Sequence, residues 1–123
     1  MKVENNTKIA RIKIYHNPRC RKSRQAVFFL KENNIDHHII LYLKEPLNQK
    51  IFATILMKLK KSPISLIRKN EPIWKQIYTG DNMNDAELIN AMILHPKLIA
   101  RPIVESENSA VVAEPAEIIK SLL

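Results

Sequence analysis

Two apolar, strand-like runs with a helical pattern between them occupy the first third of the chain, and this order constrains the fold most strongly. Residues 9–15 alternate in polarity and predict a strand that becomes more buried toward its end. A helix is expected from about Lys22 to Asn33, and the run His38–Leu43 predicts a second strand. Its continuous apolar character is typical of a strand buried on both faces of a parallel sheet. Two strands joined through a helix predict a right-handed βαβ unit.

The middle of the chain has a helical pattern throughout. Apolar residues recur at helical spacing over 51–59, and Ser62-Pro63 is typical of the start of a short new turn. Asn84 and Asp85 suit the cap of a further helix. We therefore interpret residues from about 46 to 96 as a helical insertion behind the second strand.

The C-terminal part predicts a hairpin and a last helix. Short strands over 103–104 and 110–113 flank a polar turn, and Pro115 suits the first turn of an amphipathic helix. The complete order is strand, helix, strand, helical insertion, hairpin and helix, which predicts an α/β fold. One domain is expected over residues 9–123, after a polar N-terminal extension over residues 1–8.

The composition narrows the class of protein. A chain of 123 residues has room for one substantial core, and its 46% hydrophobic content is ordinary for a globular protein. No apolar run approaches the roughly 18 residues that a membrane span needs, and residues 1–8 lack the apolar stretch of a secretory signal. The single cysteine fits a reducing compartment. We therefore expect a cytoplasmic protein without a membrane-spanning segment.

The net charge of +8 suits either a nucleic acid or a small anion as the partner. The basic residues are spread along the chain, and aromatic residues that could stack on bases make up only 6% of it. A solvated basic surface around a site for an anionic substrate is therefore favoured over a nucleic-acid interface.

The chain's only cysteine lies where an anion-binding turn is expected. Cys20 follows the first predicted strand and precedes the first predicted helix. Unpaired backbone N–H groups and the positive end of the helix dipole converge there, which favours both a bound anion and a thiolate. Arg19, Arg21, Lys22 and Arg24 add positive charge. These charged neighbours argue against burial of Cys20 as a small apolar side chain, and they favour a nucleophilic cysteine.

Other polar residues could assist this thiolate. His16 could hydrogen-bond the sulfur or cap the turn, and the alternative is a strand-end histidine without a chemical role. Asn17 could brace the loop and Ser23 could donate to an anion or to the sulfur, although both are more typical of local backbone partners. Arg68 and Arg101 offer planar forks of donors suited to tetrahedral oxyanions, although most arginines are solvated surface residues.

Common signatures of cofactor sites are missing from the sequence. The chain has a single glycine, Gly80, which excludes a glycine-rich nucleotide-binding loop. Its four histidines show no metal-ligand spacing with each other or with Cys20, so we expect no metal and no bound cofactor.

Five blocks of sequence, taken in order, resemble the ArsC family, which comprises the glutaredoxin-linked arsenate reductases and their relatives. The blocks are His16–Arg24, Ile40–Leu43, Leu66–Asn70, His95–Ile99 and Arg101–Val104. The resemblance covers nearly the whole chain, and five ordered blocks are more specific than the cysteine block alone. It implies a thioredoxin-like fold with a helical insertion, in agreement with the predicted order of elements.

The resemblance also implies a site. Cys20 and His16 would be catalytic, and a cis-proline at Pro102 would face the cysteine. On the residue chemistry and the resemblance together, the predicted substrate-binding residues are Arg68, Arg101, Ser23 and Arg24, and Asn17 is predicted to be structural.

The implied reaction is the reduction of arsenate to arsenite. The Cys20 thiolate would attack arsenate, glutathione would then attack the thiolate–arsenic adduct, and a glutaredoxin would supply the reducing equivalents. No second cysteine in the chain could resolve the adduct, which agrees with glutathione or another external thiol as the co-substrate. The expected partners are therefore an oxyanion and a thiol–disulfide protein.

One position departs from the family's pattern. The arsenate reductases carry a third arginine just before the proline that opens the last helix, and here that position is Glu114. A unit charge at ~6 Å contributes roughly 1 to 3 kcal/mol at effective dielectric constants of about 80 to 20. A carboxylate there opposes the binding of an oxyanion, so we expect arsenate turnover to be weak or absent.

Two alternatives remain. Spx-type redox regulators of the same family bind RNA polymerase and are not reductases, and the positive charge would suit an acidic protein partner. Those regulators typically carry a Cys-x-x-Cys switch, whereas Ser23 stands three residues after Cys20, and they lack the lead-in over 16–18. The other alternative is a protein with this fold and an unassigned thiol function.

Overall fold

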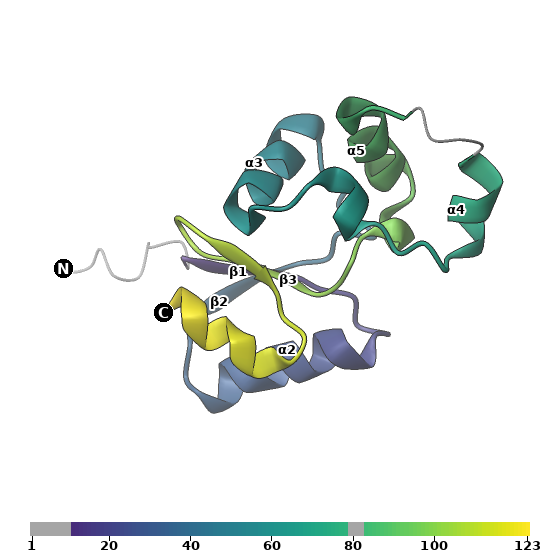
Figure 1. Cartoon of the computed structure of the whole chain (residues 1–123). Coiled ribbons are helices and arrows are strands. Elements are labelled where there is room, and N and C mark those ends of the chain that lie inside the picture. Colours follow the sequence, from purple (N-terminus) through teal and green to yellow (C-terminus); the bar gives the residue numbers. More distant parts are fainter. Residues whose placement is uncertain (1–10, 79–82) are drawn as a thin grey trace.

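A four-stranded sheet lies at the centre of the computed structural model, which describes residues 11–78 and 83–123 (Figure 1). The strands are β1 (Ile12–Tyr15), β2 (His37–Ile40), β3 (Ile103–Glu105) and β4 (Ala110–Val112). Their order across the sheet is β2-β1-β3-β4. β1 pairs in parallel with β2 and antiparallel with β3, and β3 pairs antiparallel with β4. The predicted parallel pair and the predicted hairpin are therefore confirmed.

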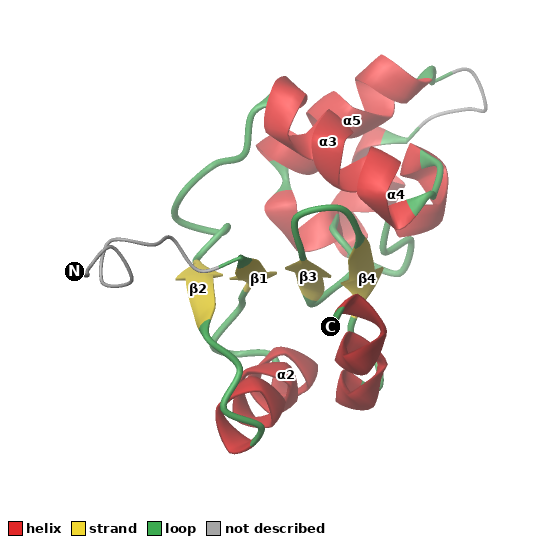
Figure 2. Cartoon of the chain, turned by 90° about the vertical axis from the view of Figure 1, so that its left-hand side faces the viewer, coloured by secondary structure: helices red, strands yellow, loops and turns green. Residues whose placement is uncertain are grey.

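Helices lie on both sides of this sheet, which forms the middle layer (Figure 2). One side carries α2 (Arg21–Glu32) and the 3₁₀ helix η3 (Ala116–Leu122). The helices between β2 and β3 lie on the other side. They are α3 (Gln49–Leu59), η1 (Pro63–Leu66), α4 (Pro72–Ile77), α5 (Asp85–Leu94) and η2 (Pro96–Leu98). This mixed α/β fold with a helical insertion is the one predicted.

Each side of the sheet has its own apolar core, because successive side chains of a strand point to opposite faces. In β1, Ile14 packs with Leu30 of α2 and Val104 of β3, and all three are fully buried. The next residue, Tyr15, belongs to the larger core on the other side, which includes the fully buried Phe52 of α3. The side chains of β1 and β3 thus pack against both layers of helices.

Side-chain caps begin two helices of the insertion. The Oδ1 atom of Asn48 accepts a hydrogen bond from the amide of Ile51 at 2.8 Å, which starts α3. At the start of α5, Asn84 and Glu87 each accept a hydrogen bond from the other's amide at 2.8 Å. This reciprocal capping box confirms the cap predicted at Asn84.

The prediction for the second strand is wrong in its extent and its burial. β2 is an edge strand with partly exposed side chains, and it ends at Ile40. The amides of Lys44 and Glu45 both donate to the Leu41 carbonyl, which turns the chain. Tyr42 is only 3% exposed and joins the larger core. The apolar run therefore reflects a strand followed by a turn that inserts Tyr42 into the core.

The last helix is a 3₁₀ helix, and Pro115 precedes it instead of forming its first turn. Pro115 has an extended backbone, with φ −74° and ψ 167°. With three residues per turn, Ile119 and Leu122 share one face of this helix, and both pack on the core beside α2. Ile118 is 41% exposed. The apolar face of the last helix is thus narrower than an α-helix would give.

Two further predictions concern the N-terminal residues and membrane-spanning helices. The extension over residues 1–8 and the first two residues of the strand predicted over 9–15 lie outside the described residues. Among the helices of the described segments, none is long and apolar enough to cross a membrane.

A buried carboxylate joins three elements beside the larger core. Glu105 at the end of β3 is 6% exposed. It accepts hydrogen bonds from the hydroxyl of Tyr15 at 2.6 Å and from the ammonium of Lys58 at 2.7 Å. Burial raises the pKa of Tyr15, and the hydrogen bond and negative charge of Glu105 raise it further. The phenol therefore remains a hydrogen-bond donor. Lys58 also donates to the Ser106 carbonyl at 2.9 Å, and the network ties α3 to β1 and β3.

Replacing Lys58 with methionine is expected to lower the free energy of unfolding by roughly 3 kcal/mol, because Glu105 then keeps a buried charge without its counter-charge. Urea denaturation measures this free energy. The matched control is Lys50→Met, an exposed lysine of the same helix. A loss below about 1 kcal/mol, the value of an exposed pair, would contradict the structural role given to Lys58.

Candidate active site

Cys20 occupies the N-cap position of α2, as the strand-to-helix turn predicts. Its backbone is extended, with φ −94° and ψ 124°, and its amide donates to the Asn17 carbonyl at 3.0 Å. The first turn of α2 contains no acidic residue, and no side chain caps it by a hydrogen bond. The positive end of this helix is therefore without a carboxylate partner, and a thiolate at Cys20 lies where a negative charge is stabilised.

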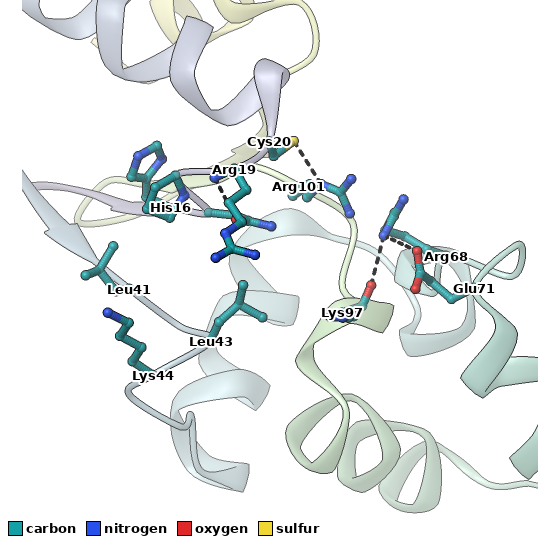
Figure 3. Close-up of a pocket in the computed structure, with 12 residues that line it drawn as sticks. His16, Arg19, Cys20, Leu41, Leu43, Lys44, Arg68, Glu71, Lys97 and Arg101 are labelled. Atoms are coloured by element: carbon teal, nitrogen blue, oxygen red, sulfur yellow. Dashed lines mark hydrogen bonds and ion pairs between the residues drawn. The ribbon is translucent and has the colours of Figure 1, made fainter.

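Arg101 contacts the sulfur of Cys20 directly (Figure 3). Its Nε–H donates to Cys20 Sγ at 2.9 Å. Burial raises the pKa of the thiol, but the hydrogen bond and charge of Arg101, together with the backbone amides of Ser23 and Lys22, outweigh this effect. The pKa of Cys20 consequently lies below the ordinary value of a thiol, which favours the nucleophilic thiolate.

The expectation that Cys20 escapes burial is wrong. The residue is 7% exposed, although its neighbours Arg19 and Arg21 are exposed. In the turn, consecutive side chains point in different directions, and Cys20 turns inward to Arg101 while the flanking arginines face solvent. The polarity of sequence neighbours therefore does not determine the burial of a residue in a tight turn.

Two cavities meet at Cys20. The larger cavity, of about 670 Å³, is lined by the loop over 16–19 and by Arg68 and Arg101. The smaller cavity, of about 380 Å³, shares Cys20 and both arginines and extends to Glu114. The fold thus brings together Cys20 from the start of α2, Arg68 from beyond η1 and Arg101 from the segment before β3. These three predicted residues are far apart in the sequence.

Arg68 is held in place by two acceptors. Its Nη1 donates to the Glu71 carboxylate at 2.8 Å and to the Lys97 carbonyl at 3.0 Å (Figure 3). Both bonds use Nη1, so in the described part of the chain Nε and Nη2 remain available to a ligand. A fixed guanidinium with free donors beside Cys20 suits the recognition of an oxyanion.

His16 bonds to Ser23 and has no hydrogen bond to Cys20 in the described structure. Its Nδ1 lies 2.5 Å from the hydroxyl oxygen of Ser23, which also accepts from the amide of Asn17 at 3.0 Å. Burial lowers the pKa of His16, and the positive charges of Arg24 and Lys31 lower it further. A neutral ring that accepts the Ser23 hydrogen at Nδ1 carries its own hydrogen at Nε2. His16 also lines the larger cavity.

Ser23 and Arg24 do not lie where the prediction of substrate binding requires. The hydroxyl of Ser23 is fully buried and engaged by His16 and Asn17. Arg24 donates to the Pro18 carbonyl at 3.0 Å and lines a different cavity, between α2 and η3. Both side chains therefore hold the loop that carries Cys20, because its polar groups need partners inside the fold.

Asn17 has the position predicted for a structural residue. Its Oδ1 accepts from the amide of Arg19 at 3.0 Å, and its carbonyl accepts from the amide of Cys20 at 3.0 Å. These bonds close the turn in front of α2.

The Arg101–Pro102 peptide is cis, as the resemblance implied. Pro102 is fully buried, and its carbonyl accepts from the amide of Ala113 at 2.8 Å. The side chain that reaches the sulfur from this segment is that of Arg101.

Glu71 and Tyr42 were not among the predicted site residues. Glu71 stands three residues after Arg68, a spacing that could have identified it as the partner of this arginine. Tyr42 has no such signal. Its burial and the nearby Cys20 raise its pKa to about 12, against the lowering effects of Arg101 and Arg68. Tyr42 therefore stays protonated behind the site.

No cluster of three or more potential metal ligands among His, Cys, Asp and Glu occurs in residues 11–78 and 83–123.

Comparisons with known proteins find relatives that match most of the chain. An uncharacterized protein, YfgD of Escherichia coli strain K12, is 38% identical over 108 residues, which are 86% of this chain and 91% of the relative. An arsenate reductase of Neisseria meningitidis serogroup A is 35% identical over 91% of this chain and 97% of its own. The solved structure of an arsenate reductase from Vibrio cholerae superposes with a TM-score of 0.87 at 32% identity, covering 94% of this chain and 100% of that chain.

The superposition extends over both layers of helices and the sheet, so the α/β architecture is that of the thioredoxin-like arsenate reductase structures. The sequence profile of the ArsC family matches residues 15–122, from the end of β1 to the last residue of η3. This range includes Cys20 and the arginines that surround it. The chain therefore belongs to the ArsC family.

Proposed function

We propose that this chain reduces arsenate to arsenite with Cys20 as the nucleophile, and that Glu114 lowers the rate without abolishing it. The observation that carries the proposal is the 2.9 Å contact of Arg101 Nε with Cys20 Sγ, beside a second arginine, Arg68, in the same cavities. Relatives named arsenate reductase, at 35% and 32% identity, support arsenate as the oxyanion.

In the proposed reaction, the Cys20 thiolate attacks arsenic and an As–O bond breaks. The departing oxygen leaves as water once it is protonated. Arg68 and Arg101 bind the remaining oxygens and stabilise the charge that develops on them. His16 lines the larger cavity, and we assign it the role of donating its Nε2–H to one of these oxygens. The product of this step is a Cys20–arsenic(V) adduct.

An external thiol completes the proposed reaction, since Cys20 is the only cysteine of the chain. In the overall balance, two thiol groups become one disulfide, arsenic(V) becomes arsenic(III), and one oxygen is released as water. We propose glutathione as this thiol, with a glutaredoxin as the protein that reduces the resulting disulfide. Cys20 returns as the thiolate.

The test is the pH dependence of Cys20 alkylation with and without arsenate, with Cys20→Ser as the blank. A pKa well below 8, together with protection by arsenate, supports the proposal. Turnover of arsenate with glutathione and glutaredoxin, against a series of other thiols, then identifies the co-substrate. An ordinary thiol pKa without protection overturns the proposal and favours a binding role without turnover.

Replacing Glu114 with arginine is expected to raise kcat/KM for arsenate about three- to tenfold at saturating thiol. The change replaces a carboxylate of the smaller cavity, which adjoins Cys20, with a cation, and the two charges together contribute about 0.7 to 1.4 kcal/mol through partly solvated surroundings. The control is Glu107→Arg in the exposed turn between β3 and β4. An unchanged kcat/KM would remove Glu114 from the account of arsenate affinity.

A further inference from the structure

The smaller cavity gives Cys20 a second approach that the oxyanion does not need. It lies toward β4 and the segment that follows it, whereas the larger cavity lies toward the loop over 16–19. Glu114 is the carboxylate of its lining, among the described residues, and Lys22 lies beside it on the first turn of α2. An oxyanion held in the larger cavity leaves this second approach to Cys20 open to another reactant.

Lys22 and Glu114 form an ion pair at the edge of the smaller cavity. The two side chains are 53% and 49% exposed, so a solute can reach both. Exposed ion pairs contribute at most about 1 kcal/mol, so opening this pair costs little. Arg19 and Arg21 line the same cavity and add positive charge.

A reactant that opens this pair must satisfy both of its members. An anion alone would pair with Lys22 and leave Glu114 without a counter-charge, and a cation alone would leave Lys22 unpaired. A molecule that carries both an ammonium and a carboxylate can pair its ammonium with Glu114 and its carboxylate with Lys22. A zwitterion therefore replaces the ion pair without leaving a charge unpaired.

We propose that the smaller cavity admits the external thiol, and that Lys22 and Glu114 select a thiol bearing both an ammonium and a carboxylate group. The inference rests on the proposed function, which requires an external thiol to reach Cys20 while an oxyanion occupies the larger cavity. It assigns recognition of the ammonium to Glu114 and recognition of the carboxylate to Lys22.

The test uses the single cysteine of the full chain, without arsenate. Cys20 is allowed to react with four symmetrical disulfides: cystine (zwitterionic), cystamine (cationic), 3,3′-dithiodipropionate (anionic) and 2-hydroxyethyl disulfide (uncharged). In each reaction the thiolate attacks one sulfur, a Cys20–reagent disulfide forms, and the other half leaves as a thiolate. Mass spectrometry follows the rate, and each rate is divided by that of the uncharged reagent in the same variant.

The relative rate of Cys20 reaction with cystine is expected to fall in both single variants. Glu114→Gln and Lys22→Gln should each reduce its relative rate about two- to fivefold, the range of one exposed charged contact. The charged reagents should move in opposite directions: dithiodipropionate speeds up in Glu114→Gln, and cystamine speeds up in Lys22→Gln. The matched controls are Glu107→Gln and Lys75→Gln, which change the net charge equally at exposed positions elsewhere.

An unspecific field predicts a different result, because it acts on net charge and leaves the net-neutral cystine unchanged in both variants. That outcome overturns the proposal, as does an equal loss in the two controls. The proposed function fails separately, if arsenate neither protects Cys20 nor turns over. The disulfide rates contain no arsenate, so selectivity for the zwitterion remains measurable in that case.

Discussion

Replacement of Arg101 by glutamine is expected to raise the pKa of Cys20 toward its ordinary value and to lower kcat/KM for arsenate by about 10²- to 10³-fold. Arg101 supplies both the hydrogen bond to Sγ and a positive charge beside it. In its absence burial, which raises the pKa of the thiol, is opposed only by backbone amides at the start of α2. The variant also loses one of the two guanidinium groups that would bind the oxyanion.

The sign of this pH effect follows from the direction of the shift. In the wild type the lowered pKa increases the thiolate fraction of Cys20 at neutral pH, and in the variant the alkylation curve moves to higher pH. Alkylation at pH 7 should therefore slow, while the rate at high pH, where the thiol is ionised in both proteins, should differ little. Arg101→Lys keeps the charge and should be intermediate. An unshifted alkylation curve in Arg101→Gln would contradict the role given to this contact.

Replacement of Arg68 by glutamine is expected to lower kcat/KM for arsenate by about 30- to 100-fold, the value of a hydrogen bond to a charged group, and to act mainly through KM. The causes of the lowered Cys20 pKa are Arg101 and the backbone amides of Ser23 and Lys22, and Arg68 is not among them. The alkylation curve should therefore keep its midpoint, which separates this variant from Arg101→Gln. Steady-state kinetics and alkylation of the same preparation give both quantities.

The control for Arg68 is Glu71→Gln, which keeps the arginine and weakens its attachment. Glu71 holds Nη1 of Arg68 at 2.8 Å, and the Lys97 carbonyl holds the same atom at 3.0 Å. One brace remains in this variant, so its KM should rise less than that of Arg68→Gln. A larger effect of Glu71→Gln than of Arg68→Gln would show that Glu71 acts on the substrate itself and not through the arginine.

The elements that could be predicted from the sequence are those whose signals are local. The alternation in β1, the caps at Asn84 and the polar turn between β3 and β4 depend on residues within a few positions of each other. The N-terminal position of Cys20 on α2 belongs to the same group. The apolar pattern gave a wrong prediction where tertiary packing determines the structure. The apolar neighbours of Tyr42 predicted a longer strand, whereas a turn inserts its ring into the core.

The site shows the same division. Arg68 and Arg101 were identified by residue chemistry and by resemblance, but the contact of Arg101 with Cys20 joins residues 81 positions apart. The partners of Ser23 and Arg24 could not be predicted either, because both residue types bind anions as readily as they bind backbone groups. Their surroundings in the folded loop assign them to His16 and to the Pro18 carbonyl.

The sequence by itself determined the order of elements, the place of the lone cysteine at a helix start and the five blocks that resemble the ArsC family. These properties depend on short stretches of the chain. Only the tertiary structure decided the burial of Cys20, its contact with Arg101 and the pairing of Lys22 with Glu114. Each of these joins segments that the sheet brings together, and the pKa of a thiol depends on the charges around it in space, whatever their distance along the chain.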